Sequence, residues 1–436
     1  MIKTGLQAIN WIHSRKKFGS RPGLMRIKYL LSLLDNPEKE INCIHIAGTN
    51  GKGSTVSYLC ALLGMVDLRV GTFTSPYVES FYERISINGR PIAEDDFLRL
   101  TNQFHFLVEK MDKMSKYKGI TEFEILTAMA LVYFKKKVDV AIFEVGIGGI
   151  LDSTNVIQPI LTAITTVGLD HTDILGQTLI EIANHKSGII KPNIPIVTGN
   201  ITKEALNVIK EKAREKNAPL LEQNNYYFNH YCYHEETNYE VFNFENKQVE
   251  FNHLEISLLG RHQIENAGVA LELFYLYCDR NDLLPSEKAV RQALKDVKWP
   301  ARMEVISKHP LIIMDGAHNP HAIRRLVENL ENEFSDKRCF ILMSALSTKD
   351  VSQMIQLILQ LTDVRLILTS FNYPNCIQLT NFEQYTIDGR FVIEDDWKKA
   401  FQKITLQMDL NDLFVVTGSL YFVSEVRQNL KNWKAT

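Results

Sequence analysis

The apolar segment Ile41-Asn42-Cys43-Ile44-His45-Ile46-Ala47 runs directly into the glycine-rich segment Gly48-Thr49-Asn50-Gly51-Lys52-Gly53-Ser54-Thr55. The first segment predicts a buried strand, and the apolar stretch 56–66 behind the glycines predicts a helix. Glycines let backbone N–H groups turn toward an anion, the start of a helix adds positive potential, and a lysine can reach the outer phosphates. This order of strand, loop and helix therefore predicts a site for nucleotide phosphates.

The match to the common phosphate loop is incomplete. Ile46 stands where the first glycine of that loop is expected, and Gly53 stands where serine or threonine would bind magnesium. The segment is either a chance run of glycines or a different type of nucleotide-binding loop. The segment alone leaves both alternatives open.

The composition is that of an ordinary globular protein. The 436 residues favour two or three domains, and 45% hydrophobic and 23% charged residues are common values. The net charge of −2, without a block of lysine and arginine, gives no indication of nucleic acid or a membrane as partner. Without a signal-peptide pattern, a bilayer-length apolar run or Cys-x-x-Cys spacing among the six cysteines, we expect a cytoplasmic protein with reduced thiols.

Short apolar runs alternate with helical patterns along the first two-thirds of the chain. The predicted strands are 41–47, 69–74, 138–143, 160–166 and 194–198, and the predicted helices are 94–113, 122–136, 177–189 and 202–215. Such alternation predicts a mostly parallel sheet. Residues 226–259 instead alternate aromatic and polar residues, which predicts antiparallel strands on one flank, and helices are expected near 261–279 and 286–296.

Pro300 disfavours a continuous helix across Trp299-Pro300, so we expect a domain boundary there. Beyond it, strands are predicted at 311–315, 338–343, 364–369 and 412–417, and helices at 320–334, 349–361, 396–407 and 420–431. We therefore expect an α/β fold in two domains. Residues 1–298 would form a P-loop-type, mostly parallel ATPase domain, and residues 299–436 a smaller Rossmann-like α/β domain.

Polar residues follow several predicted strands, and ligands of parallel α/β sheets bind at the carboxyl ends of strands. Glu144 is either a solvated carboxylate or a magnesium ligand, and its place opposite the glycine-rich loop favours the ligand. Ser75 is either a turn cap or the hydroxyl ligand that is missing at Gly53. For His171, a structural role and a metal-binding role remain open.

Three further residues have alternative roles. Lys186 is an exposed helical lysine, a lysine among phosphates and metal, or an amine that adds CO₂ and becomes an anionic carbamate ligand. Asp315 ends a predicted strand and suits contact with a ribose or a substrate, while Asn319 beyond it could simply cap a helix. Arg302 could clamp a phosphate or form an ordinary surface pair.

Taken in order, these segments resemble the folylpolyglutamate synthase/dihydrofolate synthase family of the Mur ligase superfamily. Each match is short, but the matches are collinear from residue 18 to residue 421, which makes the ordered set specific. Besides the loop Gly48–Thr55, the matching segments are 18–24, 74–76, 83–89, 121–127, 144–149, 169–172, 186–191, 262–267, 315–320 and 416–421.

The resemblance implies an ATP-dependent ligase of one-carbon metabolism that joins L-glutamate to a reduced folate through a γ-linked amide. ATP would phosphorylate the folate carboxylate, and the glutamate amine would attack the acyl phosphate. Such chemistry needs stabilisation of the transferred phosphoryl charge, magnesium, and exclusion of water. The implied partners are therefore small molecules, namely ATP, L-glutamate and a reduced folate. We expect a monomer that binds neither nucleic acid nor membranes.

The same resemblance implies roles for individual residues. The ATP site would be formed by Thr49, Asn50, Gly51, Lys52, Gly53, Ser54, Thr55, Asn266, Arg302 and Asp315. Of two Mg²⁺ ions, the first would be held by Ser75 and Glu144, and the second by His171 and a carbamylated Lys186 (N6-carboxylysine). Thr121 and Phe123 would line the folate pocket, and His318 and Ser419 the glutamate site. The catalytic set would be Lys52, Glu144, His171, Lys186 and His318.

The chain departs from the common family pattern around the expected substrate pockets. It has Tyr77, Ile150, His185 and Ala301 where His, Arg, Glu and Gly are frequent. The acceptor is therefore either a reduced folate or dihydropteroate, or both in a bifunctional enzyme. A more distant alternative is a P-loop NTPase whose hydrolysis drives a conformational switch.

Overall fold

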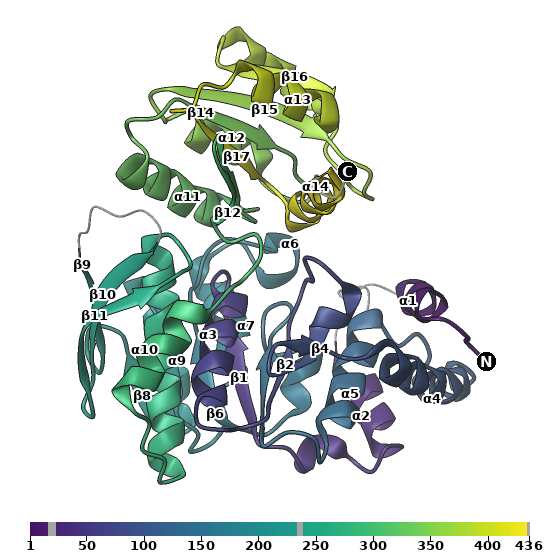
Figure 1. The fold of residues 1–436 in the computed structure, drawn as a ribbon. Helices are drawn as coiled ribbons and strands as arrows, with labels where there is room; N and C mark the ends of the chain where they lie inside the picture. Colours follow the sequence, from purple (N-terminus) through teal and green to yellow (C-terminus); the bar gives the residue numbers. More distant parts are fainter. Residues whose placement is uncertain (16–22, 233–238, 434–436) are drawn as a thin grey trace.

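The computed structural model describes residues 1–15, 23–232 and 239–433, and most of the family-like segment 18–24 lies outside the described residues. Two bodies built on separate sheets lie one above the other (Figure 1). The larger body contains an eight-stranded sheet flanked by a three-stranded sheet, and the smaller body contains a six-stranded sheet.

The eight-stranded sheet is mostly parallel and has β1 near its centre, between β5 and β6. Antiparallel pairing occurs at one edge, where β3 runs opposite to both of its neighbours, β2 and β4. In the order β4-β3-β2-β5-β1-β6-β7-β8, the strands are Arg90–Pro91, Ile85–Ile87, Val70–Phe73, Val140–Glu144, Cys43–Ala47, Pro159–Ile164, Ile196–Thr198 and Leu220–Glu222.

Alternation of side chains along the strands gives the large sheet two buried faces. Ile44 and Ile142 pack on one face with the helices Lys52–Gly64 (α3), Arg261–Arg280 (α9) and Glu287–Asp296 (α10). Cys43 and Phe143 pack on the other face with Met25–Ser32 (α2), Glu94–Asp112 (α4) and Glu122–Phe134 (α5). Ala47 lies in a further cluster with Leu179–Ser187 (α7) and Lys203–Glu215 (α8). Because successive side chains of a strand point to opposite faces, strands buried on both faces read as continuous apolar runs.

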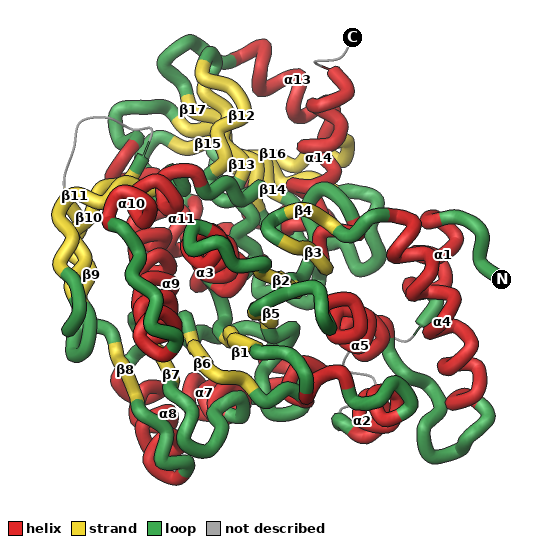
Figure 2. Tube along the Cα trace, turned by 60° about the horizontal axis from the view of Figure 1, so that its bottom comes forward, coloured by secondary structure: helices red, strands yellow, loops and turns green. Residues whose placement is uncertain are grey.

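The helices of the larger body cover both faces of its sheet, as Figure 2 also shows. They are α1 (Gly5–His13), α2 (Met25–Ser32), α3 (Lys52–Gly64), α4 (Glu94–Asp112), α5 (Glu122–Phe134), α6 (Thr172–Leu175), α7 (Leu179–Ser187), α8 (Lys203–Glu215), α9 (Arg261–Arg280) and α10 (Glu287–Asp296). The antiparallel strands β9 (Phe228–Cys232), β10 (Glu240–Glu245) and β11 (Glu250–Ile256) pack against α9 and α10.

The six-stranded sheet also has two covered faces, with α11 and α12 on one and α13 and α14 on the other. In the order β12-β13-β17-β14-β15-β16, its strands are Glu304–Lys308, Leu311–Met314, Leu413–Thr417, Cys339–Met343, Val364–Ser370 and Phe391–Asp396, and only β12 is antiparallel. The helices are α11 (Pro320–Glu333), α12 (Val351–Ile358), α13 (Trp397–Gln407) and α14 (Leu420–Trp433).

The predicted fold class is confirmed, and so are the antiparallel strands within 226–259. The sequence patterns missed the short strands β3, β4 and β8 and the strands β12 and β16. Strands of two or three residues are too short to show the alternation of apolar and polar residues that identifies a strand. The strands β12 and β16 carry charged residues among their apolar ones. The boundary at 298/299 stays a prediction. Apolar packing joins the two sides of this boundary, because Val78 and Leu259 precede it in the chain but lie in apolar clusters of the smaller body.

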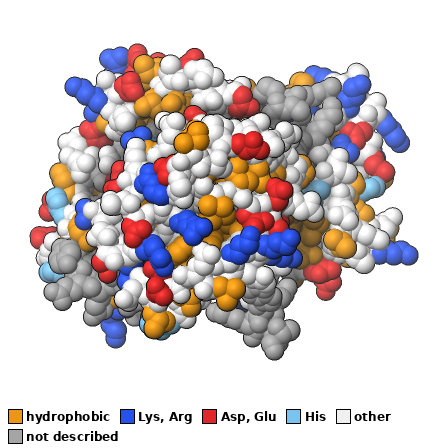
Figure 3. Space-filling model, turned by 90° about the horizontal axis from the view of Figure 1, so that it is seen from above, with side chains coloured by type: hydrophobic (Ala, Val, Ile, Leu, Met, Phe, Trp, Pro, Cys, Tyr) orange, Lys and Arg blue, Asp and Glu red, His pale blue; other side chains and the backbone are white. Residues whose placement is uncertain are grey.

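Positive and negative side chains are interspersed over the face shown in Figure 3, in keeping with the net charge of −2. The described helices include no segment with the length and hydropathy that crossing a bilayer requires.

Candidate active site

The carboxyl ends of the two sheets face one cavity of about 740 Å³. The larger body contributes residues that follow β1, β2, β5 and β6, and the smaller body contributes residues that follow β13, β14 and β17. Nearly all residues that the sequence assigns to the site line this cavity: Thr49, Asn50, Gly51, Lys52, Gly53, Ser54, Ser75, Phe123, Glu144, His171, Lys186, Asn266, Arg302, Asp315, His318 and Ser419. Thr55 and Thr121 do not.

The glycine-rich loop turns sharply between β1 and α3. Gly51 caps α3 with φ +85°, and a Cβ added there would lie 2.2 Å from Oδ1 of Asn266. Only glycine adopts this conformation and leaves this space without strain. The Lys52 ammonium donates to the carbonyl oxygens of Gly48 (3.0 Å) and Thr49 (3.2 Å). The loop is thus held tightly, with a positive charge on its surface.

Packing within the protein explains why glycine stands at position 53 and threonine at position 55. A Cβ at Gly53 would lie 3.1 Å from the Trp299 ring, so the chain following the larger body packs directly on the loop. Thr55 is fully buried, and its hydroxyl donates to the carbonyl oxygen of Asn266 (3.4 Å). The threonine therefore ties α3 to α9 and does not face the cavity.

Glu144 ends β5 as a buried carboxylate beside the loop. Its Oε2 accepts a hydrogen bond from the backbone N–H of Ser75 (3.0 Å), so two predicted magnesium ligands are in direct contact. Burial raises the pKa of Glu144, and the Lys52 charge opposes that shift. Burial likewise lowers the pKa of Lys52, and Glu144 and Asp170 oppose it. The carboxylate and the ammonium stabilise each other's charged form.

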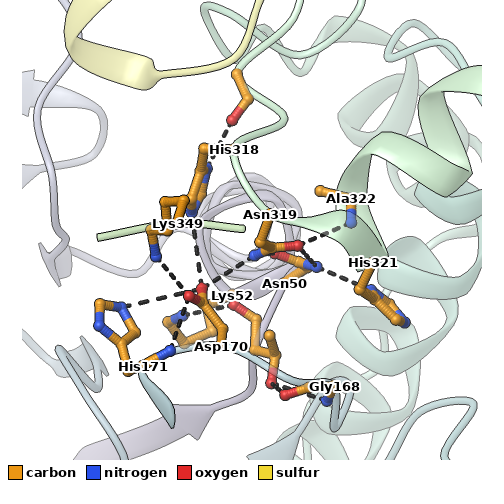
Figure 4. Close-up of polar contacts among 12 residues, drawn as sticks. Asn50, Lys52, Gly168, Asp170, His171, His318, Asn319, His321, Ala322 and Lys349 are labelled. Atoms are coloured by element: carbon orange, nitrogen blue, oxygen red, sulfur yellow. Dashed lines mark hydrogen bonds and ion pairs between the residues drawn. The ribbon is translucent and has the colours of Figure 1, made fainter. Parts of the chain in front are cut away.

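Asp170 lies at the centre of a charged cluster between the two bodies (Figure 4). Lys349 of the smaller body forms an ion pair with its Oδ1, and Nε2 of His171 and of His318 lie 3.9 and 4.0 Å from its Oδ2. Burial alone would raise the pKa of Asp170, but these three groups lower it well below its usual range. Burial lowers the pKa of both histidines to about 4, so at neutral pH they are neutral imidazoles.

A reciprocal pair of amides joins the loop to the smaller body. Asn50 Nδ2 donates to Asn319 Oδ1 (3.3 Å), and Asn319 Nδ2 donates to Asn50 Oδ1 (3.2 Å) and to Asp170 (2.9 Å). The cap expected at Asn319 is present, since its Oδ1 also accepts from the N–H of Ala322 (2.8 Å). One side chain therefore starts α11 and contacts the phosphate loop.

Lys186 is 3% exposed and points from α7 into the cavity region. The exposed-lysine alternative is therefore wrong. Burial first, and then the Lys52 charge, lower the pKa of Lys186 to about 7. Its backbone packs on the glycine turn after Glu144, where Ile150 N–H donates to the carbonyl oxygen of His185 (2.9 Å).

Gly149 sets the distance between this turn and Lys186. A Cβ added there would lie 2.5 Å from the carbonyl oxygen of His185 and 2.9 Å from that of Lys186. Both atoms belong to the backbone, so the chain at His185 and Lys186 would have to move to make room. We expect Gly149→Ala to displace Lys186 and to lower turnover by up to about 100-fold, because a displacement of about 1 Å can cost that much. Steady-state assays check this. Gly389→Ala, where a Cβ meets no atom within 4 Å, is the control, and equal turnover of both variants would contradict the expectation.

Arg302 and Asp315 line the cavity on the side of the six-stranded sheet. Both Asp315 oxygens accept backbone N–H bonds, from Met303 and Ala317 (2.9 Å each), which fixes the carboxylate. A Cβ at Gly316 would lie 2.4 Å from Nη1 of Arg302, so glycine allows the guanidinium to lie over this turn. Burial raises the pKa of Asp315, and Arg302 opposes that shift.

The two predicted folate-pocket residues differ in placement. Phe123 lines the cavity against the glycine turn, because a Cβ at Gly146 would lie 2.7 Å from its ring. Thr121 is the N-cap of α5 and forms a capping box with Glu124. Its hydroxyl is thus committed to the helix, and its contribution to the pocket stays a prediction.

Several residues without a predicted role also line the cavity. They include Arg84 and Tyr421, which lie in the family-like segments 83–89 and 416–421, and Lys349 and Tyr373. Lys349 lies in the loop after β14, so the rule that ligands bind at the carboxyl ends of parallel strands also points to it. Arg84 is 8% exposed, has a buried Nε without a hydrogen bond among the described residues, and lies over the Tyr77 ring at 5.3 Å. Only the tertiary structure brings it to the cavity.

Comparison with known proteins agrees with this architecture. Residues 46–274 match the Mur ligase middle domain, and residues 301–420 match the Mur ligase glutamate ligase domain. The dihydrofolate synthase/folylpolyglutamate synthase of Bacillus subtilis (strain 168) is 39% identical over 432 residues, which cover 97% of this chain and 98% of that protein.

Solved structures extend the similarity over nearly the whole chain. Folylpolyglutamate synthase of Mycobacterium tuberculosis with ADP has a TM-score of 0.89 at 28% identity, covering 98% of each chain. A folylpolyglutamate synthase complex with AMPPCP and folate has a TM-score of 0.86 at 33% identity, covering 98% of this chain and 100% of that one. The chain therefore belongs to the folylpolyglutamate synthase/dihydrofolate synthase family of the Mur ligase superfamily, and is an ATP-dependent ligase.

Proposed function

We propose that the protein joins L-glutamate to the γ-carboxylate of a reduced folate, with ATP converted to ADP through an acyl phosphate. One observation carries this proposal. A phosphate loop, a buried carboxylate and a buried lysine from one sheet share a cavity with Asp315, His318 and Ser419 from the other sheet. A ligase needs this arrangement, because it must hold ATP, an acid and an amine together and keep water away from the acyl phosphate.

Lys52 and the loop N–H groups would bind the phosphates and offset the charge that develops during phosphoryl transfer. Asn266, Arg302 and Asp315 would bind the rest of the nucleotide. Both Arg302 and Asp315 come from beyond residue 298, so ATP would contact both bodies. Closure of the cavity around ATP is supported by the amide pair between Asn50 and Asn319.

The residues present suit magnesium. Among the described residues, no three His, Cys, Asp or Glu side chains converge as a preformed site, so phosphate oxygens and water would have to complete the coordination. Magnesium commonly binds through one or two carboxylates plus substrate phosphates. Glu144 and Ser75 would hold the first ion, and His171 and Lys186 the second. Bound magnesium would neutralise phosphate charge during transfer.

The lysine could serve as a metal ligand only after losing its positive charge. The neutral amine of Lys186 would attack the carbon of CO₂, form an N–C bond and release a proton, which leaves an anionic carbamate. A pKa of about 7 supports this step, because much of the amine is neutral at physiological pH.

The carbamate gives a pH prediction. Above pH 7 the Lys186 amine is neutral and adds CO₂, and below pH 7 it is protonated and cannot. Protein equilibrated in CO₂-free buffer at pH 6 is expected to lose activity, and bicarbonate should restore it most completely at pH 8. All samples are assayed at one common pH, so that only the pre-equilibration differs. If bicarbonate changes nothing at any pH, Lys186 is not carbamylated.

The substrate end of the cavity supports a folate and an amino acid. Phe123 would offer an aromatic face to the folate, and His318 and Ser419 would contact the glutamate; all three line the cavity. Arg84, which lies 3.6 Å from Glu122, and Lys349, which pairs with Asp170, are the cations that the substrate carboxylates would contact.

The acceptor is tested directly. Purified protein with ATP, Mg²⁺, L-glutamate and tetrahydrofolate should give ADP and a product heavier by one glutamate, as measured by mass spectrometry. A parallel reaction with dihydropteroate separates folylpolyglutamate synthase from dihydrofolate synthase, and products from both acceptors would indicate a bifunctional enzyme. Neither ADP nor a heavier product would refute the proposal.

ATP hydrolysis that proceeds without any acceptor would instead favour the P-loop NTPase switch. The proposal further holds that the protein acts as a cytoplasmic monomer on small molecules, without nucleic acid or membrane partners. The charge balance gives no indication of nucleic acid or a membrane as partner, and the cysteine pattern favours a reducing compartment.

A further inference from the structure

The segment Ser75–Arg84, between β2 and β3, connects the two bodies. Its Val78 is 7% exposed and packs in the apolar cluster of the smaller body, with Leu420, Phe422 and Val423 of α14. A residue that follows a strand of the large sheet is thus part of the core of the other body.

Polar contacts reinforce this attachment. The Ser424 hydroxyl donates to the carbonyl oxygen of Val78, and Gln428 Nε2 donates to that of Glu79 (3.3 Å). Arg427 donates from Nε and Nη2 to the Glu304 carboxylate (2.9 and 2.7 Å) and from Nη1 to Glu79. The guanidinium therefore links the segment to β12 through two carboxylates, the geometry in which arginine forms its strongest hydrogen bonds.

The segment is internally stiff. The Glu83 carboxylate accepts from the backbone N–H groups of Val78 (3.2 Å), Glu79 (3.2 Å) and Ser80 (2.7 Å). At its start, the N–H of Ser75 donates to Glu144 (3.0 Å). The segment is thus held at Val78–Ser80 and again at Ser75, and only two residues lie between these two points.

We propose that Arg427 is a positioning residue for the magnesium site. Through Glu79 it holds Ser75 against Glu144, so that the site is complete only when α14 is docked on the segment. This inference rests on the proposed role of Ser75 and Glu144. Because linkage is reciprocal, binding of magnesium-nucleotide also favours docking of the smaller body.

Calorimetric titration with ADP, with and without Mg²⁺, tests the proposal without relying on activity. Arg427→Gln and Glu79→Gln should each reduce the gain in ADP affinity due to Mg²⁺ about tenfold, as expected for a lost charged hydrogen bond. ADP affinity without Mg²⁺ should change little. Arg427→Lys, which keeps one charged contact, should recover part of the gain.

Hydrogen exchange supplies the structural readout. Both variants should speed exchange of amides in 75–84, whereas Arg338→Gln should not. Arg338 pairs with Asp412 in the same body (2.5 Å), so it is a matched loss of an ion pair away from the segment.

The proposal is overturned if Arg427→Gln and Glu79→Gln keep the wild-type gain from Mg²⁺. If Arg427→Gln does not fold, Glu79→Gln carries the test, because Glu79 is 38% exposed. Failure of the proposed function is recognised separately, by the glutamate ligation assay on the unmodified protein.

Discussion

Replacing Glu144 by alanine is expected to lower turnover by at least about 100-fold, the size of effect seen when phosphoryl-charge stabilisation is lost. The carboxylate is buried at the end of β5, accepts the Ser75 N–H (3.0 Å) and offsets the Lys52 charge. Its removal takes away the proposed magnesium ligand. It also lowers the pKa of Lys52 further, since Glu144 is the first of the charges that raise it.

The variant Glu144→Gln removes the negative charge of this side chain but keeps its size and an oxygen that can accept a hydrogen bond. The amide can still accept from Ser75 but cannot carry the charge, so turnover should fall while the protein stays folded. Burial already disfavours the charged form, so the melting temperature of Glu144→Gln should not decrease. Asp139→Asn is the matched control, because this acid precedes the same strand at the opposite end and pairs with exposed Arg69. Near-normal turnover of Glu144→Ala in a steady-state assay would rule out the assigned role.

Replacing Lys186 by alanine is expected to cost about 100-fold in turnover as well, again through lost charge stabilisation at the transferred phosphoryl. The distinguishing result is rescue. A carbamate is a carboxylate on nitrogen, so formate or acetate can occupy the space left by the lysine and restore part of the activity. Titration of the variant with short carboxylic acids in the ligation assay measures this.

Two other lysine variants sharpen the test. Lys186→Arg fills the space and cannot be carbamylated, so carboxylic acids should not rescue it. Lys191 is half-buried and donates to Asn155 Oδ1 (2.7 Å), and burial lowers its pKa to about 8. Lys191→Ala should therefore show no carboxylate-dependent gain. Full activity of Lys186→Ala without any added acid would exclude the carbamate ligand.

Sequence patterns predicted the strands and helices whose own residues have a clear hydrophobic pattern. Strands buried on both faces, such as β1 and β5, are continuous apolar runs, and the long helices α4, α8 and α9 have amphipathic or strongly apolar patterns. Short or charged strands, such as β4 and β16, form because neighbouring strands pair with them. Their own residues carry no strong preference, so the sequence patterns missed them.

The candidate site also contains some residues that could be predicted from the sequence and some that could not. Residues at strand ends could be predicted, because the carboxyl edge of a parallel sheet gathers whatever follows each strand, as it does for Ser75, Glu144 and Asp315. Lys349 follows β14, so the same rule also applies to it, whereas Arg84 follows no strand of the sheet and reaches the cavity only through the tertiary fold. Thr55 and Thr121 lie in the predicted segments, but their hydroxyls bond within the protein and do not face the cavity.

By itself, the sequence determined that the chain has an α/β fold with a phosphate-binding loop, and the ordered motifs determined its family. These depend on hydrophobic period, glycine conformation and residue spacing along the chain. Only the tertiary structure decided that the loop, the buried Glu144 and Lys186 and the second sheet share one cavity. It also decided that Val78 and Arg427 fasten the segment carrying Ser75 to the other body. The physical reason is that the burial, the charge pairing and the lowered pKa of a side chain depend on neighbours that lie far away in the sequence.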